Sequence, residues 1–472
     1  MMTVGLGRAI HAISLLACAA LALAVPGSVR GQSTDTVRAD TTRADTTSIT
    51  SVWAATSRNS GLRLSSGHTY NRAEGLPVMI GPWFRDSIGG ITVRADVMGI
   101  LRTANHFHWD AANVGHSVTL DARHTDPGGR GWSAGVSSFD IVDAVEPWEI
   151  GGAESALATL FFHRDYRDYF GRHGAKAYAS LLMSARSSFS FEWRDERWAS
   201  RSAREVFSIW KNGARWRPNP TLDGGRFHIG VLQARLDSRN SPETPATGWN
   251  LLAEYELGSG RITSPGVISG FARSPAPGHV TYGRLFLDMR GYNRISPVTQ
   301  LNARLVLGGW LHGDPLPMER RFSVGGVGSL PGYDFREATL PGTDVFQCNS
   351  GGLPPPGVPA QCDRMALAQL EYRSELHAHF LDVMNSRPIR VRGVGLTVRP
   401  VAVAFVDAGR GWLVGQRGAG LRYPGSNIPP FGSFRTDVGL GLDLGLFGIY
   451  AAKAVSVAKE PANVFVRLSR RF

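Results

Sequence analysis

The chain has 472 residues, of which 43% are hydrophobic and 10% aromatic, and its formal net charge is +12. After residue 30 no stretch approaches the roughly 18 consecutive apolar residues of a membrane-spanning helix, so spanning helices are excluded. A nucleic-acid partner, which a basic balance can indicate, is not expected. Only four of the 51 basic residues are lysines, and the arginines are scattered through strand-like segments instead of clustered.

The N-terminal part divides into two segments before the main domain. Residues 1–31 are typical of a secretory signal, since Arg8 precedes an apolar run, Ala9–Val25, that is followed by proline and small residues. Residues 32–69 include the repeat VRADTTRADTT, which has almost no apolar side chains to bury. This composition predicts a disordered periplasmic leader, and residues 70–472 are predicted to form one domain.

From residue 91 onward, apolar and polar residues alternate in short segments divided by Gly, Pro, Asn and Asp turns. In FSFEWR (189–194) three aromatic residues alternate with Ser, Glu and Arg, and strand side chains alternate between two faces. The same alternation recurs at 91–97, 118–123, 251–257, 285–290 and 301–308. Across these segments the charged face carries both signs, which fits a polar lumen, because a lone charge facing lipid costs roughly 2–4 kcal/mol.

We therefore predict an all-β fold, a transmembrane antiparallel β-barrel with an apolar outer face. At about 10 residues per strand plus turns, the length supports roughly 14 to 18 strands. We expect about 16, since the number is typically even. The alternative is a soluble all-β protein, which so many cleanly alternating segments disfavour.

The end of the chain carries the clearest strand pattern. In DVGLGLDLGL (437–446) an unbroken aliphatic face opposes a face of Gly and Asp, which suits a wall between lipid and water. The last segment continues this pattern to the final residue, and its apolar face consists of Val464, Val466, Leu468 and Phe472. A chain that ends on a strand with a terminal aromatic resembles a bacterial outer-membrane β-barrel, whose last strand meets its first at a seam. This implies contact with outer-membrane lipid and lipopolysaccharide.

Cysteine is used sparingly. Cys18 falls within the predicted signal, which leaves Cys348 and Cys362 on either side of a Gly/Pro-rich stretch. In an exported chain, an even pair that closes one loop favours a disulfide over two free thiols.

A family resemblance comes from FSVGGVGSLPGYDFREA (322–338). It resembles the sixth extracellular loop of the BamA/TamA superfamily of outer-membrane assembly and translocation barrels, also called bacterial surface antigens, which reads roughly F-x-x-G-G-x-x-S-[VL]-R-G-[FY]. The matching residues are Phe322, Gly325, Gly326, Ser329, Leu330, Gly332 and Tyr333. The segments at 366–376, 404–412 and 436–444 resemble strands that follow this loop in the family, and 70–82 resembles the start of its barrel.

The resemblance implies a loop that folds into the lumen, where its arginine meets acidic groups from two strands. The matching acids here are Glu371 and Asp407, but the arginine position is Pro331. Three alternatives remain open. Arg336 takes the place of the missing arginine, Arg373 pairs with Glu371 within its own strand, or the two acids pair only with other lumenal arginines.

The resemblance also implies a function. The assembly factors and two-partner secretion transporters of the family carry periplasmic POTRA domains before the barrel. The residues between the predicted signal and the predicted barrel are too few for one such domain. We therefore expect a short member without POTRA domains, unless a separate periplasmic partner supplies their role. The implied activity is insertion or translocation of protein or lipid through a gated barrel, with the barrel-assembly machinery as partner during the chain's own insertion. The alternative is a passive pore, or a surface-exposed binding or anchor barrel.

An enzyme is not expected. The sequence has no G-x-S-x-G motif, no P-loop and no H-E-x-x-H motif. We therefore predict no catalytic residues, no metal site and no cofactor.

Overall fold

A computed structural model gives the structure. It describes residues 51–55, 59–66, 70–104, 110–266, 277–335, 348, 360–376, 389–391, 394–396, 400–415, 422–445, 447–456, 461–468 and 470–472. The predicted signal and the part of the predicted leader before Ser51 lie outside these residues. No helix among them has the length and apolar character needed to cross a membrane.

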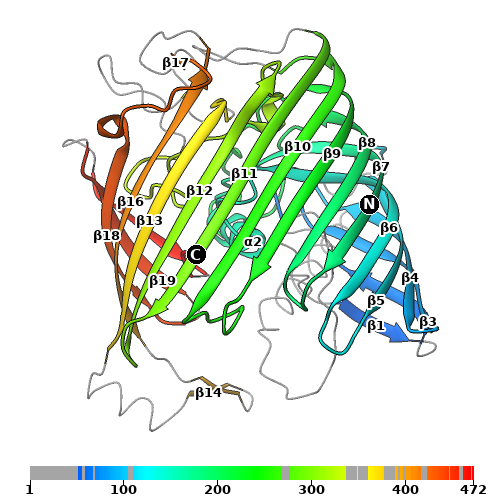
Figure 1. The fold of residues 1–472 in the computed structure, drawn as a ribbon, viewed down its shortest axis with the longest axis horizontal. Helices are drawn as coiled ribbons and strands as arrows, with labels where there is room; N and C mark the ends of the chain where they lie inside the picture. Colours follow the sequence, from blue (N-terminus) through cyan, green and yellow to red (C-terminus); the bar gives the residue numbers. More distant parts are fainter. Residues whose placement is uncertain are drawn as a thin grey trace, which may run out of the picture.

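One large sheet forms the molecule, and Figure 1 shows it curled into the wall of a barrel with tilted strands. Its strands are β1 (Ser51–Ala55), β2 (Ser60–Ser65), β3 (Pro77–Ile88), β4 (Ile91–Arg102), β5 (Val114–Thr125), β6 (Gly131–Val145), β7 (Asp168–Leu182), β8 (Ser188–Ser200), β9 (Gly224–Asp237), β10 (Gly248–Ser264), β11 (Gly278–Arg294), β12 (Thr299–Gly313), β13 (Arg364–Glu375), β16 (Val401–Val414), β17 (Arg422–Tyr423), β18 (Arg435–Asp443), β19 (Gly448–Ala454) and β20 (Asn463–Arg467). Outside the sheet lie α2 (Gly152–Phe162), η1 (Met318–Arg320), η3 (Phe431–Ser433) and the hairpin of β14 (Ile389–Val391) and β15 (Val394–Leu396).

The strands follow one another in an antiparallel series. Each strand from β1 to β13 pairs with the next, and β16, β18, β19 and β20 continue the series. Without the short β1 and the parallel β17, the eighteen-stranded sheet has sixteen strands, from β2 to β20. The predicted all-β antiparallel architecture and strand number are confirmed. Among the described residues no ladder joins β20 to β1 or β2, so strand pairing does not close the sheet, and we call the gap between β20 and the first strands the seam.

The two faces of the wall separate by polarity as the alternation predicts. In β8, Phe191 and Trp193 are 48% and 49% exposed, whereas Glu192 between them is 2% exposed. In β13, Leu370 and Tyr372 are likewise exposed while their polar neighbours are buried. The outward apolar face suits lipid, and the buried face carries paired charges.

The N-terminal boundary of the sheet differs from the prediction. Both β1 and β2 fall within residues 32–69, for which the composition predicts a disordered leader. The pairing of β1 with β2 and of β2 with β3 draws this stretch into the wall. The segment GLRL within β2 supplies the alternation, since Leu62 and Leu64 are exposed on the outer face.

The C-terminal end also differs. The pattern predicts a strand that runs to Phe472 with that ring on the outer face, but β20 ends at Arg467 and Phe472 is buried. The tail, residues 470–472, instead turns inward, where the Arg470 guanidinium donates to the carbonyl of Pro245 at 3.2 Å. The exposed Val464, Val466 and Leu468 keep their predicted outer face.

Candidate functional site

The segment between β12 and β13 occupies the lumen. We call residues 314–335 the inserted loop. Phe322, Val324 and Leu330 are fully buried there, and Tyr333 is 1% exposed. They pack with inward-facing wall residues from β11, β12, β13, β16 and β19, which are Tyr282, Phe286, Val306, Met365, Leu367, Leu413 and Ala454. The wall is apolar here because the loop covers it, so this part of the lumen is filled.

The Gly-Gly pair of the motif shapes the loop. Gly325 and Gly326 have φ angles of 129° and 99°, a region that residues with a Cβ rarely adopt. The Gly325 N–H donates to the Ser329 hydroxyl at 2.8 Å, and the Gly326 N–H donates to the Leu330 carbonyl at 3.0 Å. These bonds close a tight turn, which explains why the motif needs two glycines and a serine.

Two glutamates of the β6–β7 connection hold the loop from one side. The N–H and hydroxyl of Ser323 donate to the Glu146 carboxylate at 2.5 and 2.6 Å. The Ser329 hydroxyl lies 3.5 Å from Glu149, and the Gln369 amide of β13 donates to the Ser329 carbonyl at 3.0 Å. The inserted loop is therefore hydrogen-bonded both to the β6–β7 connection and to strand β13 of the wall.

The other side of the loop meets the last strands. The Gly332 N–H donates to the Asp437 carboxylate of β18 at 2.6 Å, and a Cβ at this glycine would lie 2.6 Å from the Asp437 Cβ. The Tyr333 hydroxyl donates to the Thr436 carbonyl at 3.2 Å, and the Asn463 amide of β20 donates to the Pro331 carbonyl at 3.2 Å. Motif residues thus contact strands beside the seam.

The two acids that the resemblance singles out are buried on neighbouring strands. Glu371 of β13 and Asp407 of β16 are both 0% exposed. Arg373 donates to Glu371 at 3.0 Å within its own strand and also bonds Asp443. The cation on Asp407 is Arg471 of the tail, one of the other lumenal arginines that the third alternative allows, although the sequence did not single it out. The other candidate, Arg336, lies outside the described residues.

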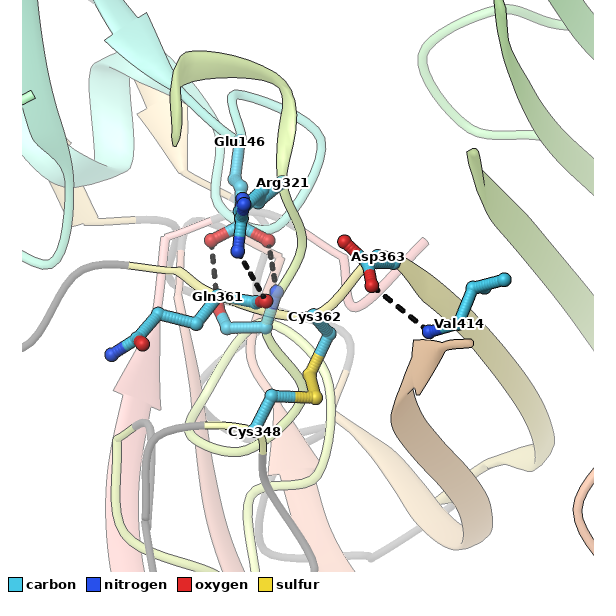
Figure 2. Close-up of a disulfide and its surroundings, with 8 residues drawn as sticks. Glu146, Arg321, Cys348, Gln361, Cys362, Asp363 and Val414 are labelled. Atoms are coloured by element: carbon cyan, nitrogen blue, oxygen red, sulfur yellow. Dashed lines mark hydrogen bonds between the residues drawn. A yellow bond between two sulfur atoms is a disulfide. The ribbon is translucent and has the colours of Figure 1, made fainter. Parts of the chain in front are cut away.

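The predicted disulfide is present between Cys348 and Cys362, whose Cα atoms are 5.1 Å apart. Figure 2 shows it beside β13 and the inserted loop, with Arg321 donating to the Gln361 carbonyl at 3.3 Å. Phe322 and Cys362 also exchange two backbone hydrogen bonds, at 3.0 and 2.9 Å. The disulfide therefore anchors the return of the chain next to the motif phenylalanine.

Helix α2 also lies inside the barrel, behind the front wall in Figure 1. Its Glu154 pairs with Arg467 of β20 at 2.6 Å, and the same arginine donates to the Val327 carbonyl of the inserted loop at 3.2 Å. The sequence analysis missed this helix. The available signal was the segment ESALATLFF, which lacks strand alternation and is rich in helix formers.

The segment that resembles the start of the family barrel, residues 70–82, comprises the connection from β2 to β3 and the first half of β3, and residues 71–75 of it are buried. Arg72 is 0% exposed, and its guanidinium pairs with Asp168 at 2.9 Å. Glu74 pairs with Arg102 of β4 at 2.8 Å. Because antiparallel strands alternate in direction, this connection, the α2 connection and the inserted loop start from the same end of the barrel.

One acid of the inserted loop has an unusual environment. Neither carboxylate oxygen of Glu319, in η1, has a hydrogen-bond partner among the described residues. Burial, followed by the negative charge of Asp223, raises the pKa of Glu319 well above its usual range, although Arg320 and nearby backbone N–H groups lower it. The described residues contain no cluster of three or more His, Cys, Asp or Glu residues able to hold a metal ion.

Comparisons with known proteins give structural likeness only. No protein-family model and no curated protein sequence match the chain. Among solved structures, it is similar to BamA from Haemophilus ducreyi lacking POTRA domains 1-3, with 14% identity, a TM-score of 0.47, and coverage of 87% of this chain and 70% of that one. It is also similar to CdiB from Acinetobacter baumannii (12% identity, TM-score 0.30, coverage 84% and 57%) and CdiB from Escherichia coli (10%, 0.35, 87% and 61%).

The chain thus spans less than two thirds of each CdiB chain. The three identities are low and the three TM-scores are below 0.5.

Proposed function

We propose that this chain is an outer-membrane barrel of the BamA/TamA-like superfamily that assists the insertion or translocation of protein or lipid through a gated seam. The carrying observation is the inserted loop, whose motif residues bond to β18 and β20 beside the seam. A loop held in this place responds when the last strands move. A gated barrel needs such a contact between the loop in its lumen and the strands at its seam. A passive pore does not need it.

The pairing of the last strand supports the seam as the moving part. β20 pairs with β19 over five residues, from Asn463 to Arg467, whereas β13 pairs with β16 over twelve. Ladder hydrogen bonds and cross-strand contacts add residue by residue. A short ladder to β19 therefore leaves β20 as a lightly held edge strand, and its other edge forms the seam.

The outer face supports a lipid environment. Exposed apolar side chains recur on alternate positions of the wall strands, while the charged side chains of the same strands are buried. The partners we propose are outer-membrane lipid and lipopolysaccharide on this face, the barrel-assembly machinery during the chain's own insertion, and a periplasmic protein that delivers the substrate.

The test is insertion of a urea-unfolded eight-stranded outer-membrane barrel into liposomes that contain the purified protein. The seam is crosslinked by combining Val464→Cys in β20 with either Leu62→Cys or Leu64→Cys in β2, and we call each combination a seam pair. All three positions are exposed on the outer face. The matched control pair, Ile449→Cys with Val466→Cys, joins direct partners of the β19–β20 ladder and leaves the seam free.

We expect the protein to accelerate insertion over empty liposomes, the oxidised seam pair to abolish this acceleration, and the oxidised control pair to retain it. Absence of any acceleration would favour the alternative, a pore or a surface-binding or anchor barrel. Acceleration that survives the oxidised seam pair would place the activity elsewhere than at the seam.

A further inference from the structure

We infer that Arg471 is a positioning residue that couples the C-terminal tail to the inserted loop through a pair of facing carboxylates. The inference goes beyond the proposed function, because it concerns which residue holds the loop in place. Its test uses a readout that does not need insertion activity.

The carboxylate pair lies on adjacent strands. Asp407 of β16 and Asp437 of β18 are direct partners in their ladder, and both are 0% exposed. Glu371, on the next strand, is also fully buried. Buried carboxylates are costly unless cations or N–H donors satisfy them. Three acids in one place therefore require partners.

Each acid has a different partner. The loop provides the Gly332 N–H for Asp437 at 2.6 Å, and Arg373 of the wall provides the cation for Glu371 at 3.0 Å. Asp407 receives Arg471, which is 5% exposed. Among the described residues, no other cation is within ion-pair distance of Asp407.

Arg471 is also positioned by its surroundings. Its guanidinium carbon lies 3.5 Å from the centre of the Phe405 ring, an arrangement that favours a cation over the ring face. Its Nη1 atom is 4.0 Å from Glu371. One side chain therefore spans two of the three acids.

The tail reaches this position because the strand stops early. β20 ends at Arg467, and the tail turns into the lumen with Phe472 buried and Arg470 bonded to Pro245 of the β9–β10 connection. A strand that continued to the last residue would keep these side chains in the wall. Because the tail leaves the strand, the Arg471 guanidinium lies beside Asp407 and Glu371.

The described residues of the inserted loop bring no cation to the same place. Pro331, next to Gly332, has neither a charge nor an N–H. The loop therefore supplies a backbone donor and the tail supplies the cation, on two carboxylates that face each other. Loss of either contact changes the environment of the other, and such coupling between two sites is reciprocal.

The test is the rate at which a membrane-impermeant maleimide labels a cysteine in the loop, introduced as Val327→Cys. Removing one partner of a buried ion pair is strongly destabilising, so Arg471→Gln should raise the labelling rate on the order of a hundredfold. Adding Pro331→Arg should restore the slow rate, because it brings a guanidinium to the residue beside Gly332. The matched control is Arg226→Gln, which breaks an exposed arginine–aspartate pair on the wall and should leave the rate unchanged.

An unchanged rate in Arg471→Gln, or a raised rate that Pro331→Arg does not lower, would overturn the inference. If Arg471→Gln does not fold into a compact species, the double variant Arg471→Gln with Asp407→Asn tests the inference instead. Recovery of folding in the neutral pair supports the coupling, since the unpaired buried charge is gone. Failure of both variants to fold contradicts it.

Discussion

At the scale of single residues, Gly332 illustrates a close approach that only glycine allows. Its missing Cβ would lie 2.6 Å from the Asp437 Cβ and 2.7 Å from the Ala454 backbone N. Gly332→Ala should therefore push the inserted loop from β18 at a cost of roughly 1–3 kcal/mol. The measurement is heat-modifiability, the temperature at which the barrel stops migrating as a compact species on gels. We expect a lower temperature for the variant.

The control for this change is Gly432→Ala, since a Cβ there meets nothing within 4 Å. It should leave the transition temperature unchanged. Equal behaviour of the two variants would mean that the loop does not lie against β18 as the structure has it.

Glu319 gives a prediction for pH. Because burial and Asp223 raise its pKa, the folded protein holds this proton more tightly than the unfolded chain. Its contribution to stability is therefore fully present below the unfolded pKa, about 4.3, and is lost as pH rises through the raised folded pKa. Glu319→Gln should be more stable than the parent at neutral pH and should flatten the decline in transition temperature as pH rises.

The control for the pH series is the exposed Glu243→Gln, which should keep the parent's profile. If Glu319→Gln and the parent lose stability with pH in parallel, the Glu319 carboxyl is not buried without a partner.

At the scale of elements, the disulfide closes the segment that leads from the inserted loop back to β13. The Cys348–Cys362 bond closes a loop of 14 residues and lies beside the backbone pairing of Phe322 with Cys362. A crosslink over this length contributes about 3 kcal/mol in the chain-entropy account. Replacing both cysteines with serine should lower the transition temperature and expose the loop to protease. Full retention of both properties would show that the packing of the loop alone holds it.

The elements that the sequence predicted are those set by local alternation. β8 and β13 are examples, because period-2 polarity alone decides which of their side chains face outward. β20 was predicted too long, since its last residues leave the strand and Arg471 pairs with Asp407 of β16, a contact that strand alternation does not predict. Helix α2 was missed because the alternation of barrel strands does not predict a helix inside the barrel.

The candidate site was likewise predicted only where its residues follow a local sequence pattern. The motif residues of the inserted loop, such as Gly332 and Tyr333, could be named because their spacing is local. Their partners Glu146 and Asp437 lie more than a hundred residues away in sequence, and Arg471 lies 64 residues from its partner Asp407. Strand alternation says which side chains face the lumen but not which of them meet, so these pairings required the structure.

At the scale of the whole molecule, the inserted loop and the α2 connection enter the interior from one end of the wall, and the tail enters from the other. The inserted loop contacts α2 through Arg467, and the tail reaches the acids from the seam side. The last strands, the loop and the tail therefore form one connected set of contacts. If the seam opens as we propose, all of these contacts change together, and removal of the loop should open the lumen.

Single-channel conductance of the purified barrel in planar bilayers tests this account most directly. The parent is compared with a variant that lacks residues 325–335 and with a control that lacks the Gly/Pro-rich stretch 354–359, which lies outside the described residues. We predict a small, flickering conductance for the parent and the control, and a large, steady conductance once the motif segment is removed. A large, steady conductance in all three proteins would contradict a lumen filled by the inserted loop.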